Sequence, residues 1–140
     1  MTFKDCIKFA GENPVSFLAT IDNNQPRVRA VMLWYADESG FYFQTFDTKD
    51  FQSQLKNNPK TEVCFHRERD MVSNMLRVAG EVQFLEDKSL MEKVFKTRPF
   101  LRNLGYTPDS PGVVIFRIEH GVAYFFNSLK IHDPKVFINF

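Results

Sequence analysis

Two arginines, followed by threonines and a lysine, are the residues of this sequence best suited to bind an anion. One residue separates Arg27 from Arg29, so both side chains lie on the same face of a strand. Thr45, Thr48 and Lys49 follow, and a helix is expected to begin near Thr48. The first turn of a helix offers unpaired N–H groups and the positive end of its dipole, which favour a phosphate. The alternative is a surface strand with solvated arginines and an ordinary threonine cap.

Motifs for several other chemistries are absent. The 6 glycines are too dispersed for a dinucleotide-binding or P-loop sequence, and there is no GxSxG motif. His66, His120 and His132 are far apart in the sequence, so no metal site is predicted. Cys64 lies in an apolar run, which is typical of a buried, unreactive thiol. No catalytic residue is therefore assigned.

Capping, turn and periodicity signals predict the elements that position these residues. Helices are expected at Phe3–Ala10, Thr48–Asn57 and from Asp87 onward, with a further helical turn at Pro99. Strands are expected at Val15–Ile21, Gln25–Tyr35, Phe41–Thr45, Thr61–His66, Met75–Leu85, Val113–Glu119 and Val122–Phe126. Loops are expected at Arg67–Asp70 with Ser73-Asn74 and at Gly105–Gly112, a bulge at Gly80, and a hinge at His120-Gly121.

The order of these elements predicts a mainly β fold. About six strands are joined mostly as hairpins and no βαβ unit is present, which favours a small antiparallel barrel with two or three flanking helices. Residues 1–140 are expected to form one domain. The tail Ser128–Phe140 contains the apolar stretch Val136–Ile138, which could be an edge strand or an arm in a dimer.

Composition narrows the class of protein further. A net charge of +1 indicates no nucleic acid partner and no anionic membrane surface. The apolar runs are too short to span a membrane, and the charged N-terminus is unlike a signal peptide. The 2 cysteines form no CxxC motif, so a cytoplasmic protein with reduced thiols is expected. The 16 phenylalanines exceed what a barrel of this size readily hides, which favours a homodimer.

Five segments, in order, resemble the FMN-binding split barrel of the pyridoxamine 5′-phosphate oxidase family. These segments read PRVRAV, DESGFYFQT, NNPKTEVCF, MLRVAGEVQFLED and VVIFRIEHGVAYF. The resemblance runs from about Phe17 to Phe126, which is most of the chain, and is strongest to the short branch of general-stress-protein and nitroimidazole-resistance-like flavoproteins. The resemblance implies a six-stranded antiparallel split β-barrel that forms a homodimer, with FMN bound in clefts between the two subunits.

The resemblance also assigns residues to the cofactor. Arg29 falls on the phosphate-binding arginine, with Arg27 on the same strand face, and Ala30 and Val31 fall on the backbone that lines the isoalloxazine ring. Gln44 and Thr45 match a pair that contacts the flavin and its ribityl chain. The full set of expected cofactor-binding residues is Arg27, Arg29, Ala30, Val31, Gln44, Thr45, Thr48, Lys49 and Met75.

The sequence departs from the family pattern at three of the matched positions. The family's Ser-Arg-Lys phosphate motif falls on Lys49, Asp50 and Phe51, so only its first position is basic here. Met75 stands where the family has a glutamine that contacts the flavin of the neighbouring subunit. The tryptophan and arginine that close the family's active site have no clear match, although Phe125 or Phe126 could replace the aromatic residue.

The expected function is that of an FMN-dependent oxidoreductase acting on a small molecule, with a nicotinamide as a possible electron donor. Because the flavin carries the chemistry, such an enzyme needs no conspicuous acid or base. Three alternatives remain open at this stage. They are a non-catalytic flavin-binding or sensor protein, a split barrel that uses F420 or haem, and a barrel that acts only through its interfaces.

Overall fold

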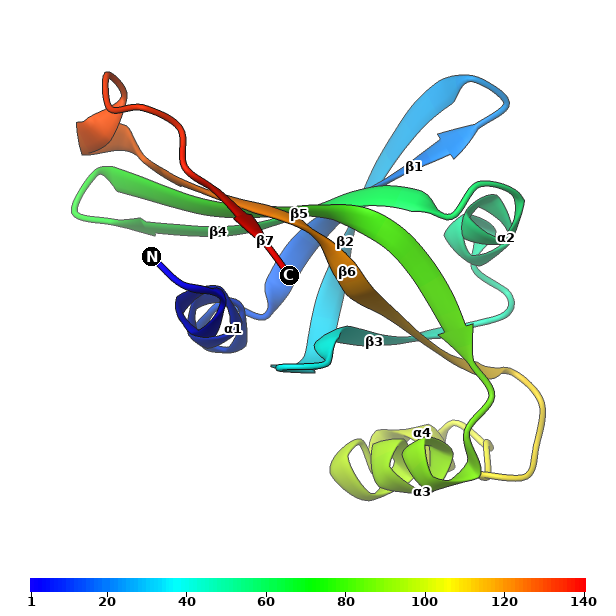
Figure 1. Ribbon diagram of the computed structural model, residues 1–140. Helices are drawn as coiled ribbons and strands as arrows, with labels where there is room; N and C mark the ends of the chain where they lie inside the picture. The colour runs from blue at the N-terminus through cyan, green and yellow to red at the C-terminus, as the bar shows by residue number, and fades with distance from the viewer.

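The computed structural model describes residues 1–140, which form seven strands, four α-helices and one short 3₁₀-helix (Figure 1). The strands are β1 Val15–Asp22, β2 Gln25–Asp37, β3 Gly40–Phe46, β4 Lys60–Arg69, β5 Val72–Leu85, β6 Val113–Asn127 and β7 Phe137–Asn139. The helices are α1 Phe3–Glu12, α2 Asp50–Asn57, α3 Lys88–Thr97, α4 Phe100–Asn103 and the 3₁₀-helix η1 Ser128–Lys130.

The strands form an antiparallel barrel. Their order is β3-β2-β1-β4-β5-β6-β7, and an additional pairing between β3 and β6 closes a ring of six. The first half of β6 pairs with β3, whereas Val122–Tyr124 of its second half pair with β7. The predicted six-stranded barrel is therefore confirmed, and the tail supplies a short seventh strand at an edge.

The barrel is split between β2 and β3. These two strands pair only where Leu33–Asp37 lies against Gly40–Phe43. The first half of β2, residues 25–32, pairs with β1 on one edge and with no strand on the other. Helix α2 lies beside the β1–β2 hairpin at this end of the barrel (Figure 1). The split leaves backbone N–H and C=O groups of β2 available to a ligand.

Two hairpin turns, Asn23-Asn24 and Asp70-Met71, have the same backbone conformation but differ in how clearly their residue types indicate a turn. Asn23 and Asn24 have φ angles of 45° and 69°, as expected for asparagines in a two-residue turn. Asp70 and Met71 adopt the same left-handed conformation, with φ angles of 52° and 62°. The loop predicted at Arg67–Asp70 and Ser73-Asn74 is therefore wrong, because methionine is not a residue that signals a tight turn and the strands continue to Arg69 and from Val72.

Two other expected boundaries are also wrong. Helix α2 begins at Asp50, with Lys49 as its N-cap residue and no side-chain cap, so Thr48 lies in the preceding turn. Strand β6 runs unbroken through His120-Gly121. Gly121 allows β5 and β6 to approach closely, because a Cβ atom at this residue would lie 2.1 Å from the carbonyl oxygen of Ala79. The bulge expected at Gly80 lies on the facing strand, because Glu81 of β5 is opposite both Glu119 and His120 of β6.

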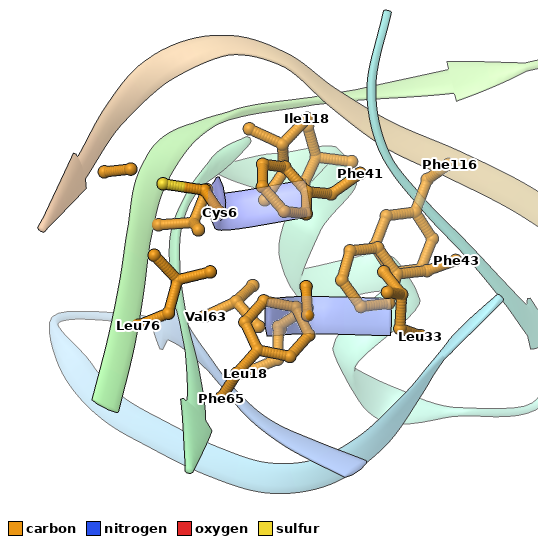
Figure 2. Close-up of a cluster of buried hydrophobic side chains, with 14 of the residues drawn as sticks. Cys6, Leu18, Leu33, Phe41, Phe43, Val63, Phe65, Leu76, Phe116 and Ile118 are labelled. Carbon is orange, nitrogen blue, oxygen red and sulfur yellow. The ribbon is translucent and has the colours of Figure 1, made fainter. Parts of the chain in front are cut away.

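Of the 16 phenylalanines, 7 are buried and 6 are half-buried. A cluster of 17 buried residues occupies the barrel, and Figure 2 shows its aromatic part around Phe41, Phe43, Phe65 and Phe116. A second cluster of 5 buried residues lies between the barrel and helices α3 and α4. Only Phe17, Phe100 and Phe137 are exposed among the phenylalanines. The excess of phenylalanine is therefore hidden within one chain and is not itself evidence for a dimer.

The outer face of β1 and β2 is nevertheless apolar and uncovered. Val15 pairs with Met32, Phe17 with Ala30 and Ala19 with Val28, so these side chains form a continuous surface. The exposed fractions of Val28, Met32 and Phe17 are 70%, 54% and 47%. The surface is continuous with the outer faces of β4 and β5, where an ion pair joins Arg77 and Glu62. We refer to Val15, Phe17, Val28, Ala30 and Met32 as the apolar face.

Candidate functional site

A groove lies at the split end of the barrel, between the start of β2 and the first turns of α2. Its volume is about 620 Å³. Its lining residues come from the β1–β2 turn, from β2 and from α2, and they are Asp22, Arg27, Val28, Arg29, Ala30, Lys49, Asp50, Phe51 and Gln54. The groove therefore combines a free strand edge, a helix N-terminus and several charged side chains.

Arg29 is the central cation of this groove and is held in place by hydrogen bonds. Its Nη1 donates to the Thr20 hydroxyl at 2.8 Å and to the Leu18 carbonyl at 3.2 Å, and its Nη2 donates to Gln54 Oε1 at 2.9 Å. The guanidinium also lies 5.2 Å from the centre of the Phe51 ring. Because arginine has five N–H donors, two remain free for a ligand.

The charge on Arg29 is retained although the side chain is half-buried. Burial lowers the pKa of Arg29, and the nearby carboxylate of Asp50 opposes this change. Since an arginine guanidinium is not deprotonated in proteins, the side chain keeps its charge at physiological pH. The fixed position of this cation suits it to a charge-assisted contact with an anion.

Two further cations and two carboxylates line the groove. Arg27 is exposed and lies 3.3 Å from Asp22, which neutralises much of its charge. Lys49 is exposed at the N-cap of α2, where no side chain caps the free N–H groups of the first turn. Asp50 is the first residue of α2. The groove is therefore weakly positive, with three cations and two carboxylates in its lining.

The structure brings together only part of the predicted set. Arg27, Arg29, Ala30 and Lys49 line the groove. The remaining five predicted residues lie outside its lining: Val31 is half-buried on β2, Thr48 is exposed in the turn before α2, Gln44 and Thr45 are buried in β3, and Met75 is half-buried on β5. Met75 pairs with His66 and Phe126, three strands away from β2, so within one chain it cannot reach Arg29.

The side chain of Gln44 is committed to a different contact. Its Oε1 accepts a hydrogen bond from Arg98 Nη1 at 3.0 Å, and its Nε2 donates to the Thr45 carbonyl at 3.0 Å. Arg98 Nη2 donates to the Leu33 carbonyl at 3.1 Å, at the point where β2 and β3 separate. Burial lowers the pKa of Arg98, and no carboxylate lies within ion-pair distance.

Sequence reasoning missed several of these contacts. Arg98, Thr20 and Gln54 carry no local motif, because their roles depend on partners from other elements. Thr20 lies on β1 and Gln54 on α2, yet both contact the same guanidinium on β2. An arginine directly before Pro99, between two short helices, was the only available signal for Arg98.

The structure shows no group of three or more histidine, cysteine, aspartate or glutamate side chains placed to hold a metal ion. No helix is both long enough and apolar enough to cross a membrane.

Comparison with known proteins identifies the family. Residues 3–125 match the family model described as pyridoxamine 5′-phosphate oxidase. A pyridoxine/pyridoxamine 5′-phosphate oxidase from Pelagibacter ubique is 32% identical over 99 residues, which are 70% of this chain and 46% of that protein. The chain thus spans less than half the length of the curated relatives it matches.

Solved structures share the fold at lower sequence identity. A NimC/NimA family protein from Clostridium acetobutylicum has a TM-score of 0.81 and 23% identity, over 98% of this chain and 92% of that one. General Stress Protein 26 from Bacillus anthracis has a TM-score of 0.76 and 22% identity, over the full length of both chains. The fold is also that of HutZ, described as a haem storage protein from Vibrio cholerae, with a TM-score of 0.66 and 15% identity over 85% of this chain and 90% of that one. By its sequence match over most of its length, the chain belongs to the pyridoxamine 5′-phosphate oxidase family.

Proposed function

We propose that this protein is an FMN-dependent oxidoreductase that acts on a small molecule. The observation that carries the proposal is the groove at the split of the barrel, where Arg29 and Lys49 meet the uncapped N-terminus of α2 beside the free edge of β2. Membership of the pyridoxamine 5′-phosphate oxidase family and the names of its curated relatives support a redox function.

The donors of the groove fit the phosphate end of FMN. The two free N–H groups of Arg29 and the N–H groups of the first turn of α2 would bind phosphate oxygens. Lys49 would add a point charge at the rim. The unpaired backbone edge at Ala30 would offer hydrogen bonds to the ring, whereas the carbonyl of the neighbouring Val31 accepts a hydrogen bond from the Ser16 hydroxyl. Bound there, a flavin would supply the transfer of a hydride or of electrons to and from the substrate.

We further propose that the protein works as a homodimer formed through the apolar face. A surface of paired apolar side chains, with exposed fractions of 47–70% at its larger residues, is typical of an interface. Met75 supports this arrangement, because it lies outside its own groove and would need a second subunit to contact a flavin. We propose a nicotinamide as the electron donor and a small molecule as the substrate of this dimer.

The histidines do not favour haem as the cofactor. His66 bonds to the Ser73 hydroxyl at 2.9 Å, His120 lies 3.9 Å from Glu119, and His132 is exposed in the tail. None of the three lines the groove. A haem spectrum in the purified protein would therefore contradict the proposed flavin site.

The test is a titration of the purified protein with FMN, followed by flavin fluorescence and absorbance, and then anaerobic addition of NADH or NADPH. We expect saturable binding of one FMN per chain and bleaching of the bound flavin by one of the two nicotinamides. Binding without reduction by either donor would favour a flavin carrier or sensor. A haem spectrum in the purified protein, with no flavin binding, would contradict the proposal.

A further inference from the structure

The groove contains two carboxylates among its cations, which is unusual for a site that binds a phosphate. Asp22 lies against Arg27, so this pair contributes little net charge. Arg29 and Lys49 then face the single carboxylate of Asp50. A phosphate monoester carries a charge of about −1.5 to −2 at neutral pH, so the groove does not match it in full.

Asp50 occupies the electrostatic position that a phosphate would take. It is the first residue of α2, where a negative charge is stabilised by the helix dipole. It lines the same groove as Arg29. Burial lowers the pKa of that guanidinium, and the charge of Asp50 opposes this change. Both features that would attract a phosphate, the helix N-terminus and Arg29, are therefore already partly neutralised by a residue of the chain.

Phe51, the residue after Asp50, provides no polar side-chain contact for a phosphate. Phe51 places its ring 5.2 Å from the Arg29 guanidinium and has no hydrogen-bond donor in its side chain. The two first-turn residues of α2 that line the groove, Asp50 and Phe51, thus offer a phosphate a carboxylate and an aromatic ring but no side-chain donor. A carboxylate accepts hydrogen bonds from hydroxyl groups, so Asp50 suits a polyol better than a dianion.

We infer that Asp50 is a specificity-determining residue that makes the groove bind FMN and riboflavin with similar affinity. This inference rests on the proposed function, since it concerns how the same groove selects its flavin. The isoalloxazine ring and ribityl chain supply most of the binding, and repulsion from Asp50 offsets the attraction between the phosphate and Arg29.

The test compares FMN and riboflavin titrations of the unchanged protein with those of Asp50→Asn. A matched control is Asp47→Asn, which removes the same charge from an exposed residue that does not line the groove. Asp50→Ser provides a second variant whose side chain is also tolerated at a helix N-terminus. Thermal unfolding and far-ultraviolet circular dichroism establish that each variant is folded.

For the unchanged protein we expect dissociation constants for FMN and riboflavin within about threefold of each other, because the charge of Asp50 opposes that of Arg29 and the exposed Lys49 is screened by solvent. Asp50→Asn and Asp50→Ser should bind FMN about tenfold more tightly, since one unit of like charge is removed near the phosphate. Riboflavin affinity should change by less than about twofold, and Asp47→Asn should leave both affinities unchanged, because neither case involves a charge beside the phosphate.

Two results would overturn the inference, and they differ in what else they affect. A strong preference of the unchanged protein for FMN, with no tightening in either Asp50 variant, would overturn the role of Asp50 and leave the proposed function standing. Failure of both flavins to bind the unchanged protein and all variants would overturn the proposed function as well.

Discussion

At the scale of single residues, the Arg29 guanidinium has two roles: it hydrogen-bonds to neighbouring elements of the barrel and it lines the groove. Arg29 uses three of its donors to hold Thr20, Gln54 and the Leu18 carbonyl, so it both supports the split end of the barrel and presents a charge to the groove. A substitution there affects stability and ligand binding together. The two effects are separated by comparing ligands with and without a phosphate.

Arg29→Ala should weaken FMN binding by about tenfold to a hundredfold, because charge-assisted contacts contribute roughly 1.5–3 kcal/mol. Riboflavin should be affected much less, since it lacks the phosphate. Fluorescence titrations with both flavins measure the two effects. Arg102→Ala is a suitable control, because Arg102 is exposed on α4 outside the groove. An equal loss of FMN and riboflavin affinity would show that Arg29 acts only on the barrel.

Cys6 gives the protein a pH dependence of stability in the alkaline range. Its thiol is fully buried in α1, and burial raises its pKa from 9.0 to about 11. The folded protein therefore keeps a proton that the unfolded chain loses between pH 9.0 and about 11, and stability falls as pH rises through this window.

The loss attributable to Cys6 should be about 2 kcal/mol at about pH 11, at 1.4 kcal/mol for each pKa unit. Urea unfolding of the unchanged protein and of Cys6→Ala, each at about pH 8 and about pH 11, isolates this contribution from other titrating groups. We expect the stability advantage of the unchanged protein to shrink with pH. A constant difference between the two proteins would exclude Cys6 as its source.

At the scale of elements, the closest approaches between strands occur at glycines. Gly80 and Gly121 are paired across β5 and β6, next to a bulge, and Phe140 donates to and accepts from the backbone of Gly121 at 3.1 Å and 3.0 Å. The Phe140 ring then packs against Phe3 and Phe41. This crossing joins the tail, α1 and the barrel.

Gly121→Ala should destabilise the protein by roughly 2–3 kcal/mol, because its Cβ would overlap the Ala79 carbonyl oxygen and approach the Phe140 ring. Gly11→Ala is the matched comparison, since a Cβ there would meet nothing within 4 Å. Alanine in a helix should stabilise by up to about 1 kcal/mol at that position. Chemical denaturation measures both changes, and a neutral Gly121→Ala would show that the crossing strands can move apart.

At the scale of the whole molecule, the two sides of the sheet differ in how far they are covered by the rest of the chain. The inner side and the side beneath α3 and α4 are closed by buried clusters within the chain. The apolar face remains uncovered, and it lies on the same strand as the groove. The proposed dimer would cover this face, which includes groove residues Val28 and Ala30.

Phe17→Glu should convert the proposed dimer to a monomer, because it puts a charge at the centre of the apolar face, where Phe17 pairs with Ala30 and Cys64. Leu104→Glu is the control, since Leu104 is 60% exposed but lies outside this face. Sedimentation equilibrium at micromolar concentration distinguishes the two states. A monomeric unchanged protein that binds flavin stoichiometrically would contradict the interface model.

The sequence alone determined the features that depend on near neighbours. Helix α1 is capped by Thr2 and Asp5 as their spacing predicts, and α3 is capped by Asp87. The Asn23-Asn24 turn, the alternation of Arg27 and Arg29, and the order of the strands follow from short-range rules of turn chemistry and strand periodicity. These rules, with the five family segments, were sufficient for the barrel, and they singled out Arg29 and Lys49, which the structure places in one groove.

Only the tertiary structure decided which distant residues share a contact. Thr20 and Gln54 meet at Arg29, Arg98 reaches Gln44, and Asp50 enters the groove. The separation of β2 from β3, and the uncovered apolar face, likewise depend on pairings over long stretches of chain. Sequence spacing fixes the direction of a side chain along its own element, whereas the neighbours of that side chain are fixed by how elements pack. That packing is decided by burial over the whole molecule.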